Sequence, residues 1–274
     1  MHYLKLTTII LFVLSCAAYG ISEFVYKKDV DTTPPVITAE MDLLEVSVKD
    51  DQRKLYEGLT AMDDKDGDIT DRIMISGESY FMSANECSIR YLVFDAAHNS
   101  AVYKRTIRYT DYTPPRFSLD QPLIYTVGSN MKFMDEIKAA DCIDGDITGK
   151  IRMLSSSISN YMEGVYPAKF EVMNTHGQKA TVDVNILVTA ESYEPTVQLK
   201  EYITYVKQGA DFDPYALIEH ATNQDGKKLD HHVVRVNGIV KTDTPGTYTL
   251  FYSTSSDDSL KGTYLSVVVE EAHT

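Results

Sequence analysis

One unit of about 80 residues is written three times along this chain. Similar openings, TTPPVITA, YTPPRFSL and YEPTVQL, place Pro35, Pro115 and Pro195 at intervals of 80 positions. A fixed period of this kind indicates a tandem array in which each repeat is one structural module. The 274 residues are therefore expected to form three small domains with separate cores.

Short segments inside each unit alternate between polar and apolar residues. Residues 103–109 read YKRTIRY and residues 181–188 read TVDVNILV. Alternation with period two is typical of strands that bury one face, and Gly, Asn, Asp and Pro separate these segments as turn residues do. The 19 Tyr residues agree, because Tyr is favoured on strands. About seven short strands per unit predict an all-β fold of immunoglobulin-like β-sandwiches.

The predicted domains are residues 32–111, 112–192 and 193–272, called repeats 1, 2 and 3 below. They are joined by TDYTPP and ESYEP, which are short and end in proline. Proline fixes its own φ and restricts the residue before it, so these joints are expected to be extended and stiff. We expect the array to be a rod.

An acidic loop recurs in repeats 1 and 2, as AMDDKDGDIT from Ala61 and AADCIDGDIT from Ala139. Close carboxylates are ligands that calcium prefers. The candidate metal ligands are Asp63, Asp66, Asp68, Asp141, Asp144 and Asp146. The loop is not an EF-hand, because counting from Gly67 as position six puts Met62 and Ile73 at the positions that require acids.

A tight turn explains the same loop without a metal. Asp-Gly pairs favour turns, since glycine adopts positive φ freely and aspartate bonds nearby backbone N–H groups. Repeat 3 keeps Asp225-Gly226 but continues with Lys227 and Lys228, which favours the turn. Both interpretations stay open. Asp95 and Asp111 lie on either side of the last strand of repeat 1. A cation site between domains is one interpretation of Asp111 at the linker, but solvated turn and linker acids are the preferred interpretation of both.

Three patterns together resemble the bacterial immunoglobulin-like domains of the pesticidal-crystal-protein type, which occur in tandem on secreted and surface proteins. They are the opening DTTPPVI, the loop ending in DGDIT, and the closing FDAAHN followed by RTIRYTD. The resemblance covers repeat 1 best and repeat 3 least. It implies a β-sandwich used as a spacer or binding module, without known catalysis and without a specified ligand. His98 departs from it, because the family usually has glycine there.

Residues 1–28 are an export signal of some kind, with a lysine followed by an apolar run from Leu6 to about Ile21. Three interpretations stay open: an uncleaved signal anchor, a lipoprotein signal with the lipid on Cys16, and a cleaved signal peptide. All three place the repeats outside the cytoplasm, and the first two anchor the protein to the cell membrane.

The remaining features point away from catalysis and nucleic acid. The net charge of −14 argues against nucleic acid as the main partner. Cys16, Cys87 and Cys142 fall in different segments, so no disulfide within a repeat is expected. No catalytic motif occurs, and adjacent His231 and His232 do not suit one zinc ion. We expect a non-enzymatic surface spacer or adhesion module. The alternative is an accessory protein that binds a glycan or a partner in an envelope enzyme or polysaccharide system.

Overall fold

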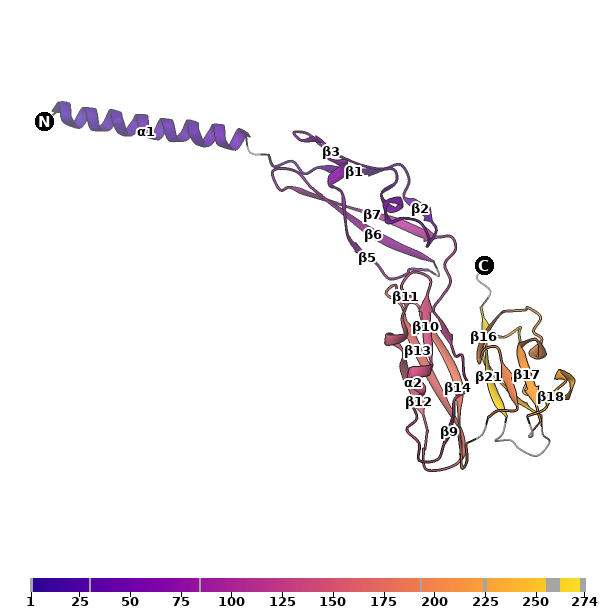
Figure 1. Ribbon diagram of the computed structural model, residues 1–274. Helices are drawn as coiled ribbons and strands as arrows, with labels where there is room; N and C mark the ends of the chain where they lie inside the picture. Colours follow the sequence, from indigo (N-terminus) through magenta and orange to yellow (C-terminus); the bar gives the residue numbers. More distant parts are fainter. Residues whose placement is uncertain are drawn as a thin grey trace. The chain divides into compact units, whose positions relative to one another are not determined.

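The computed structural model describes residues 2–29, 31–83, 85–192, 194–223, 226–254 and 262–271 (Figure 1). The chain divides into two compact units, Met1–Thr110 and Asp111–Thr274. The first unit holds a long helix, α1 (His2–Asp29), and repeat 1. The second unit holds repeats 2 and 3 together, and each unit is described by itself below.

Repeat 1 is a sandwich of a three-stranded sheet, in the order β1-β3-β4, and a four-stranded sheet, in the order β2-β7-β6-β5. Strand β6 shows why the sequence folds this way: Cys87, Ile89, Tyr91 and Val93 alternate along it and all are fully buried. The elements of repeat 1 are β1 (Val36–Ala39), β2 (Leu43–Val46), the 3-10 helix η1 (Gln52–Tyr56), β3 (Leu59–Asp63), β4 (Gly67–Asp68), η2 (Thr70–Arg72), β5 (Met74–Glu78), β6 (Glu86–Phe94) and β7 (Ser100–Tyr109).

Repeat 2 has the same plan, with sheets β11-β10-β8 and β12-β13-β14-β9. Its elements are β8 (Arg116–Ser118), β9 (Ile124–Thr126), α2 (Phe133–Glu136), β10 (Lys138–Asp141), β11 (Gly145–Asp146), η3 (Thr148–Lys150), β12 (Arg152–Ser156), β13 (Gly164–Met173) and β14 (Lys179–Thr189).

Repeat 3 repeats the plan again, with sheets β15-β17-β18 and β16-β21-β20-β19. Its elements are β15 (Val197–Leu199), β16 (Ile203–Lys207), η4 (Pro214–Leu217), β17 (Ile218–Thr222), β18 (Lys228–Leu229), η5 (His231–Val233), β19 (Arg235–Asn237), β20 (Gly246–Ser253) and β21 (Thr263–Glu270). The predicted all-β fold of three tandem sandwiches is therefore confirmed. Residues 193 and 272, the predicted bounds of repeat 3, lie outside the described residues.

Repeats 2 and 3 are not joined by a linker alone, which corrects the expected rod for this pair. Their buried apolar residues form one continuous core, and β14 and β21 lie side by side (Figure 1). The cause is visible in β14, where Ile186, Leu187, Val188 and Thr189 are buried in succession, so this end of the strand is covered on both faces. The alternation that predicted one wet face holds only for the first part of the strand.

Polar contacts fix the same interface. The Arg116 guanidinium forms a bidentate salt bridge with Glu270, at 2.9 and 2.7 Å, and lies 4.9 Å from the centre of the Tyr205 ring. The Phe117 N–H donates to the Tyr205 hydroxyl at 2.6 Å. Bidentate arginine pairs fix orientation as well as energy. Repeats 2 and 3 therefore form one body.

Candidate metal centre

The acidic loop is a tight turn between two antiparallel strands in both repeats. Asp63 pairs with Gly67 across β3 and β4, and Asp141 pairs with Gly145 across β10 and β11. The two glycines have φ of 74° and 70°, a region that other residues rarely adopt. The residue that begins each turn also fixes it: Asp63 Oδ1 accepts the N–H groups of residues 65 and 66 at 3.0 and 2.9 Å. Asp141 Oδ1 makes the matching bonds at 2.9 and 3.0 Å.

The second predicted ligand of each loop, Asp66 or Asp144, connects the turn to the opposite sheet by hydrogen bonds. Asp66 Oδ2 accepts the backbone N–H of Ala96 at 2.7 Å and Arg72 Nη1 at 2.9 Å. In repeat 2, Asp144 Oδ2 accepts the Thr175 N–H and Lys150 Nζ, both at 2.8 Å. Both carboxylates therefore already have a cationic partner and a backbone donor.

The third predicted ligand of each loop accepts the N–H of the first residue of the 3-10 helix that follows. Asp68 Oδ1 accepts the Thr70 N–H at 3.0 Å, and Asp146 Oδ1 accepts the Thr148 N–H at 2.9 Å. Among the described residues, the predicted sets Asp63, Asp66, Asp68 and Asp141, Asp144, Asp146 do not form groups with ligand atoms within 4.8 Å of one another. Each of the six predicted ligands accepts at least one hydrogen bond within or around its turn.

Asp63 instead joins Asp31, which directly precedes repeat 1, and Asp95, which lies near its last strand. One carboxylate oxygen each of Asp31, Asp63 and Asp95 lie within 4.8 Å of one another. We name these three residues the aspartate cluster. Asp31 precedes β1, Asp63 ends β3, and Asp95 follows β6. Three turns from both sheets therefore meet at one end of the sandwich.

The aspartate cluster is buried more than its sequence context predicts. Asp63 is 8% exposed and Asp95 is 5% exposed, so the interpretation of Asp95 as a solvated acid is wrong. The Asp95 carboxylate accepts the Asn99 N–H and the Asn99 side-chain amide, each at 2.7 Å. These bonds draw the turn after β6 inward. Asp111 is exposed in the second unit, as expected of a linker acid.

Hydrogen bonds satisfy the cluster only in part. Asn99 Nδ2 also donates to the Asp31 carbonyl at 3.3 Å, and Asp31 Oδ1 accepts the Thr33 N–H at 3.0 Å. The N–H groups of Asp66 and Lys65, in that order, lower the pKa of the Asp63 carboxyl, which is therefore ionised at neutral pH. Its second oxygen, Oδ2, is buried without any hydrogen-bond partner. A buried, ionised oxygen without a partner is costly, so it calls for a cation.

The equivalent group in repeat 2 has no such deficit. Asn174 stands where Asp95 stands in repeat 1, and its Oδ1 accepts the Gln178 N–H at 2.8 Å. Its Nδ2 donates to Asp141 Oδ2 at 3.1 Å and to the Tyr112 hydroxyl at 2.9 Å. A neutral amide therefore satisfies the aspartate oxygen that is left open in repeat 1. In repeat 3, Thr222 ends the corresponding strand, and Asp225 lies outside the described residues.

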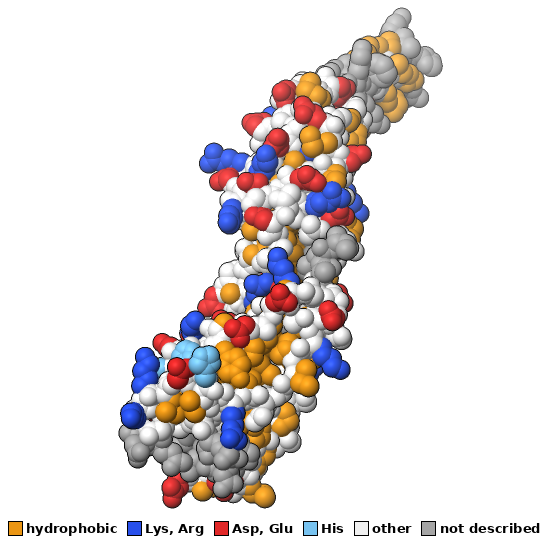
Figure 2. Space-filling view, turned by 90° about the vertical axis from the view of Figure 1, so that its right-hand side faces the viewer, with side chains coloured by type: hydrophobic (Ala, Val, Ile, Leu, Met, Phe, Trp, Pro, Cys, Tyr) orange, Lys and Arg blue, Asp and Glu red, His pale blue; other side chains and the backbone are white. Residues whose placement is uncertain are grey.

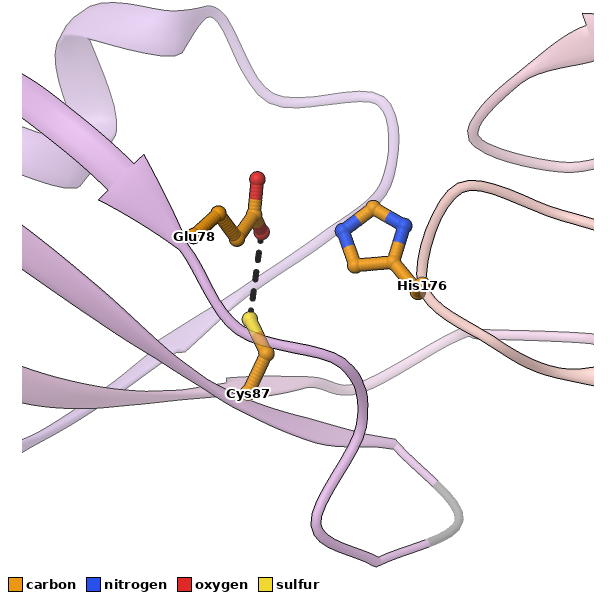
Figure 3. Close-up of side chains that lie close together, drawn as sticks. All are labelled: Glu78, Cys87 and His176. Atoms are coloured by element: carbon orange, nitrogen blue, oxygen red, sulfur yellow. Dashed lines mark hydrogen bonds between the residues drawn. The ribbon is translucent and has the colours of Figure 1, made fainter.

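A buried thiol that bonds to an exposed carboxylate in repeat 1 is a different arrangement. The Cys87 thiol donates to the Glu78 carboxylate at 3.2 Å (Figure 3). Burial, and after it the neighbouring carboxylate, raise the pKa of the Cys87 thiol. The thiol is therefore protonated and acts as a hydrogen-bond donor. Cys16, Cys87 and Cys142 are all free, as predicted.

Comparisons with known proteins agree with a repeat protein but do not show a family. No protein-family profile matches the chain. The chain is similar to the pesticidal crystal protein Cry22Aa of Bacillus thuringiensis. The two are 26% identical over 144 aligned residues, which are 50% of this chain and 20% of Cry22Aa. Thus the chain spans about a fifth of that curated relative.

Solved structures give likenesses of low score. The CBM51-2 and INT domains of Clostridium perfringens ZmpB, solved with GlcNAc, match 54% of this chain and 26% of theirs, with 18% identity and a TM-score of 0.24. The protocadherin gammaB4 extracellular domain matches 88% of this chain and 51% of its own, with 10% identity and a TM-score of 0.22.

Proposed function

We propose that this protein is a non-enzymatic, extracytoplasmic repeat protein, held at the membrane by its N-terminal segment, that acts as a surface spacer or adhesion module. The observation that carries the proposal is the threefold repetition of one complete sandwich behind an apolar helix. Repeated β-sandwiches give a rigid scaffold whose end loops are available for binding. Several modules in one chain also add avidity.

The N-terminal helix supports attachment through its chemistry. Ile9, Leu11, Phe12 and Ile21 of α1 are all more than half exposed, so most of their apolar surface is available to a membrane. Cys16 is exposed on the same helix, where a lipid is attachable. In the described part of the chain, no helix combines the length and the hydropathy that crossing a membrane requires.

Membrane attachment is testable with the full chain and a Cys16→Ser variant in a bacterial host. We expect the protein in the membrane fraction after a high-salt wash, and we expect protease added to intact cells to digest the repeats. If the Cys16→Ser protein is absent from the membrane fraction, the attachment is through a lipid on Cys16. Recovery of the wild type in the cytosol, protected from protease, would overturn the proposal.

An accessory protein that binds a glycan is the second candidate. Repeat 3 carries an open depression of about 830 Å³, lined by Asp213, Tyr215, Ala216, Lys228, Leu229, Asp230, His231 and His232. An exposed tyrosine face beside carboxylates and imidazoles suits a sugar ring and its hydroxyl groups. Figure 2 shows histidine side chains beside a hydrophobic area on this part of the surface, with acidic and basic side chains interspersed elsewhere.

A glycan array with the full chain tests this candidate. Tyr215→Ala removes the aromatic side chain of the depression, and Tyr161→Ala removes an 81% exposed tyrosine from repeat 2 as a matched control. Binding of a defined sugar that is lost in the first variant and kept in the second would support glycan recognition. Binding that neither variant changes, or no binding, would count against it.

A further inference from the structure

We infer that the aspartate cluster of repeat 1 is a calcium site, that it binds one ion per chain, and that repeat 2 does not bind calcium at the equivalent position. The inference is independent of the proposed function, because it concerns what stabilises repeat 1 in any setting. It also replaces the ligand set expected from the acidic loop.

The first reason is the electrostatics of the cluster. Asp31, Asp63 and Asp95 bring three formal negative charges together. Within the described residues, the salt bridges do not include any of these carboxylates. Lys65 contributes a weak attraction to Asp63, the last of the causes that lower its pKa. Like charges at this separation repel each other strongly away from water, and a divalent cation removes the repulsion.

The second reason is the buried Oδ2 oxygen of Asp63. Its partner atom Oδ1 is held by two backbone N–H groups, so the carboxylate cannot turn to present Oδ2 to solvent without breaking the turn. The oxygen is therefore fixed in place, buried and without a donor. A metal ion that binds a protein exchanges some of its hydration water for oxygens of this kind, which are already in place and lack a hydrogen-bond donor.

The donor chemistry selects the ion. All three side chains offer oxygen, which suits hard cations better than zinc, whose structural sites are built from cysteine and histidine. Calcium accepts irregular geometry and completes its six to eight ligands with water, whereas magnesium requires a near-ideal octahedron. Asp31 is half-buried, which leaves the side of the cluster nearest to it open to water. Calcium is therefore the expected ion.

Repeat 2 is a control built into the same chain. The backbone around Asn174 matches that around Asp95: the residue four positions on donates its N–H to the side-chain oxygen in both turns, at 2.8 and 2.7 Å. The difference is the amide of Asn174, which donates to the oxygen that a metal would ligate. The position in repeat 2 is therefore neutralised by a hydrogen bond instead of an ion.

The test is calcium titration calorimetry on the full chain in mild detergent, after removal of metal with a chelator. We expect one calcium per chain, with a Kd near the range of about 0.1–1 mM that is typical of extracellular modules, and weaker binding of magnesium. Asp31→Asn and Asp95→Asn are each expected to weaken binding at least tenfold. Asp141→Asn, at the position in repeat 2 that corresponds to Asp63, is expected to leave binding unchanged.

Three results would overturn the inference: no binding at about 10 mM calcium, binding that persists in both repeat 1 variants, or binding lost in Asp141→Asn. Circular dichroism of each variant shows whether it is folded. Asp31→Asn keeps the inference testable if Asp95→Asn unfolds, because Asp31 is half-buried and asparagine retains an Oδ1 acceptor for Thr33. Two ions per chain would contradict the assignment to repeat 1 alone.

Discussion

Repeats 1 and 2 fold the same acidic turn and differ in what lies against it. In both, the first predicted ligand holds the turn, the second bonds to the opposite sheet and the third accepts the N–H of the first residue of a 3-10 helix. In repeat 1 the first aspartate faces two further acids, and in repeat 2 it faces an amide and a phenol. The repeated motif therefore encodes the turn, and residues outside the motif decide whether the turn attracts a cation.

The largest expected effect is from removing the first aspartate in repeat 2. Asp141→Ala deprives three N–H donors of their acceptor without relieving any repulsion. We expect a loss of about 2–4 kcal/mol in unfolding free energy, since unsatisfied buried donors are costly. Chemical denaturation in chelator measures it. Asp63→Ala is the matched variant and should cost less there, because it also removes charge from the cluster; an equal or larger cost would mean that the cluster is not repulsive.

The next effect comes from giving repeat 2 the acid of repeat 1. Asn174→Asp replaces the donor to Asp141 with a second carboxylate. We expect a loss of about 1–3 kcal/mol at neutral pH, because a buried hydrogen bond becomes a like-charge contact. The loss should shrink as pH falls and one of the two acids takes up a proton. Thermal unfolding at neutral and acidic pH checks both parts, and no destabilisation at neutral pH would contradict the comparison.

The reverse substitution should stabilise repeat 1 in the absence of metal. Asp95→Asn removes one charge and supplies a donor close to the buried Asp63 oxygen, as Asn174 does for Asp141. We expect a gain of about 0.5–1.5 kcal/mol in chelator, the usual net value of one hydrogen bond. The same variant should lose the calcium-dependent rise in melting temperature that we expect for the wild type. Destabilisation in chelator would mean that Asp95 has a structural role that asparagine cannot fill.

The smallest effect should be shared by the two repeats. Thr70, through its hydroxyl and then its N–H, lowers the pKa of Asp68, and the N–H and then the hydroxyl of Thr148 lower the pKa of Asp146. Because the folded pKa values lie below the ordinary aspartate value of 3.8, the stability from each bond is present above that pH and is lost as pH falls through the folded pKa. Denaturation across the acid range should show a reduced pH dependence in Asp68→Asn and in Asp146→Asn alike. A reduced pH dependence in only one of the two variants would contradict the equivalence of the two turns in the structure.

The sequence predicted what depends on local pattern. Period-two alternation located the strands, and the Asp-Gly pairs located the turns whose glycines have positive φ. The aspartate cluster was missed because its other members lie 32 positions before and after Asp63 and meet it only when the two sheets pack. The signal was present in the DTTPP and FDAAHN motifs, each of which contains one of these acids.

The packing of repeat 2 on repeat 3 could not be predicted from the sequence for a similar reason. Arg116 and Glu270 are 154 positions apart, and nothing local distinguishes either from a solvated charge. The run of consecutive apolar residues at the end of β14 was the available signal, because a strand with one wet face would have alternated to its end.

The parallel pairing of an early strand with the last strand in each sandwich has a mechanical consequence. β2 runs parallel to β7, β9 to β14 and β16 to β21, over four, three and five residue pairs. Tension that reaches such a pair from opposite ends of the chain pulls the two strands along their length, so the hydrogen bonds bear the force together instead of opening one by one. When the chain is pulled from both ends, the resistance of each repeat to unfolding is then set by these few residue pairs.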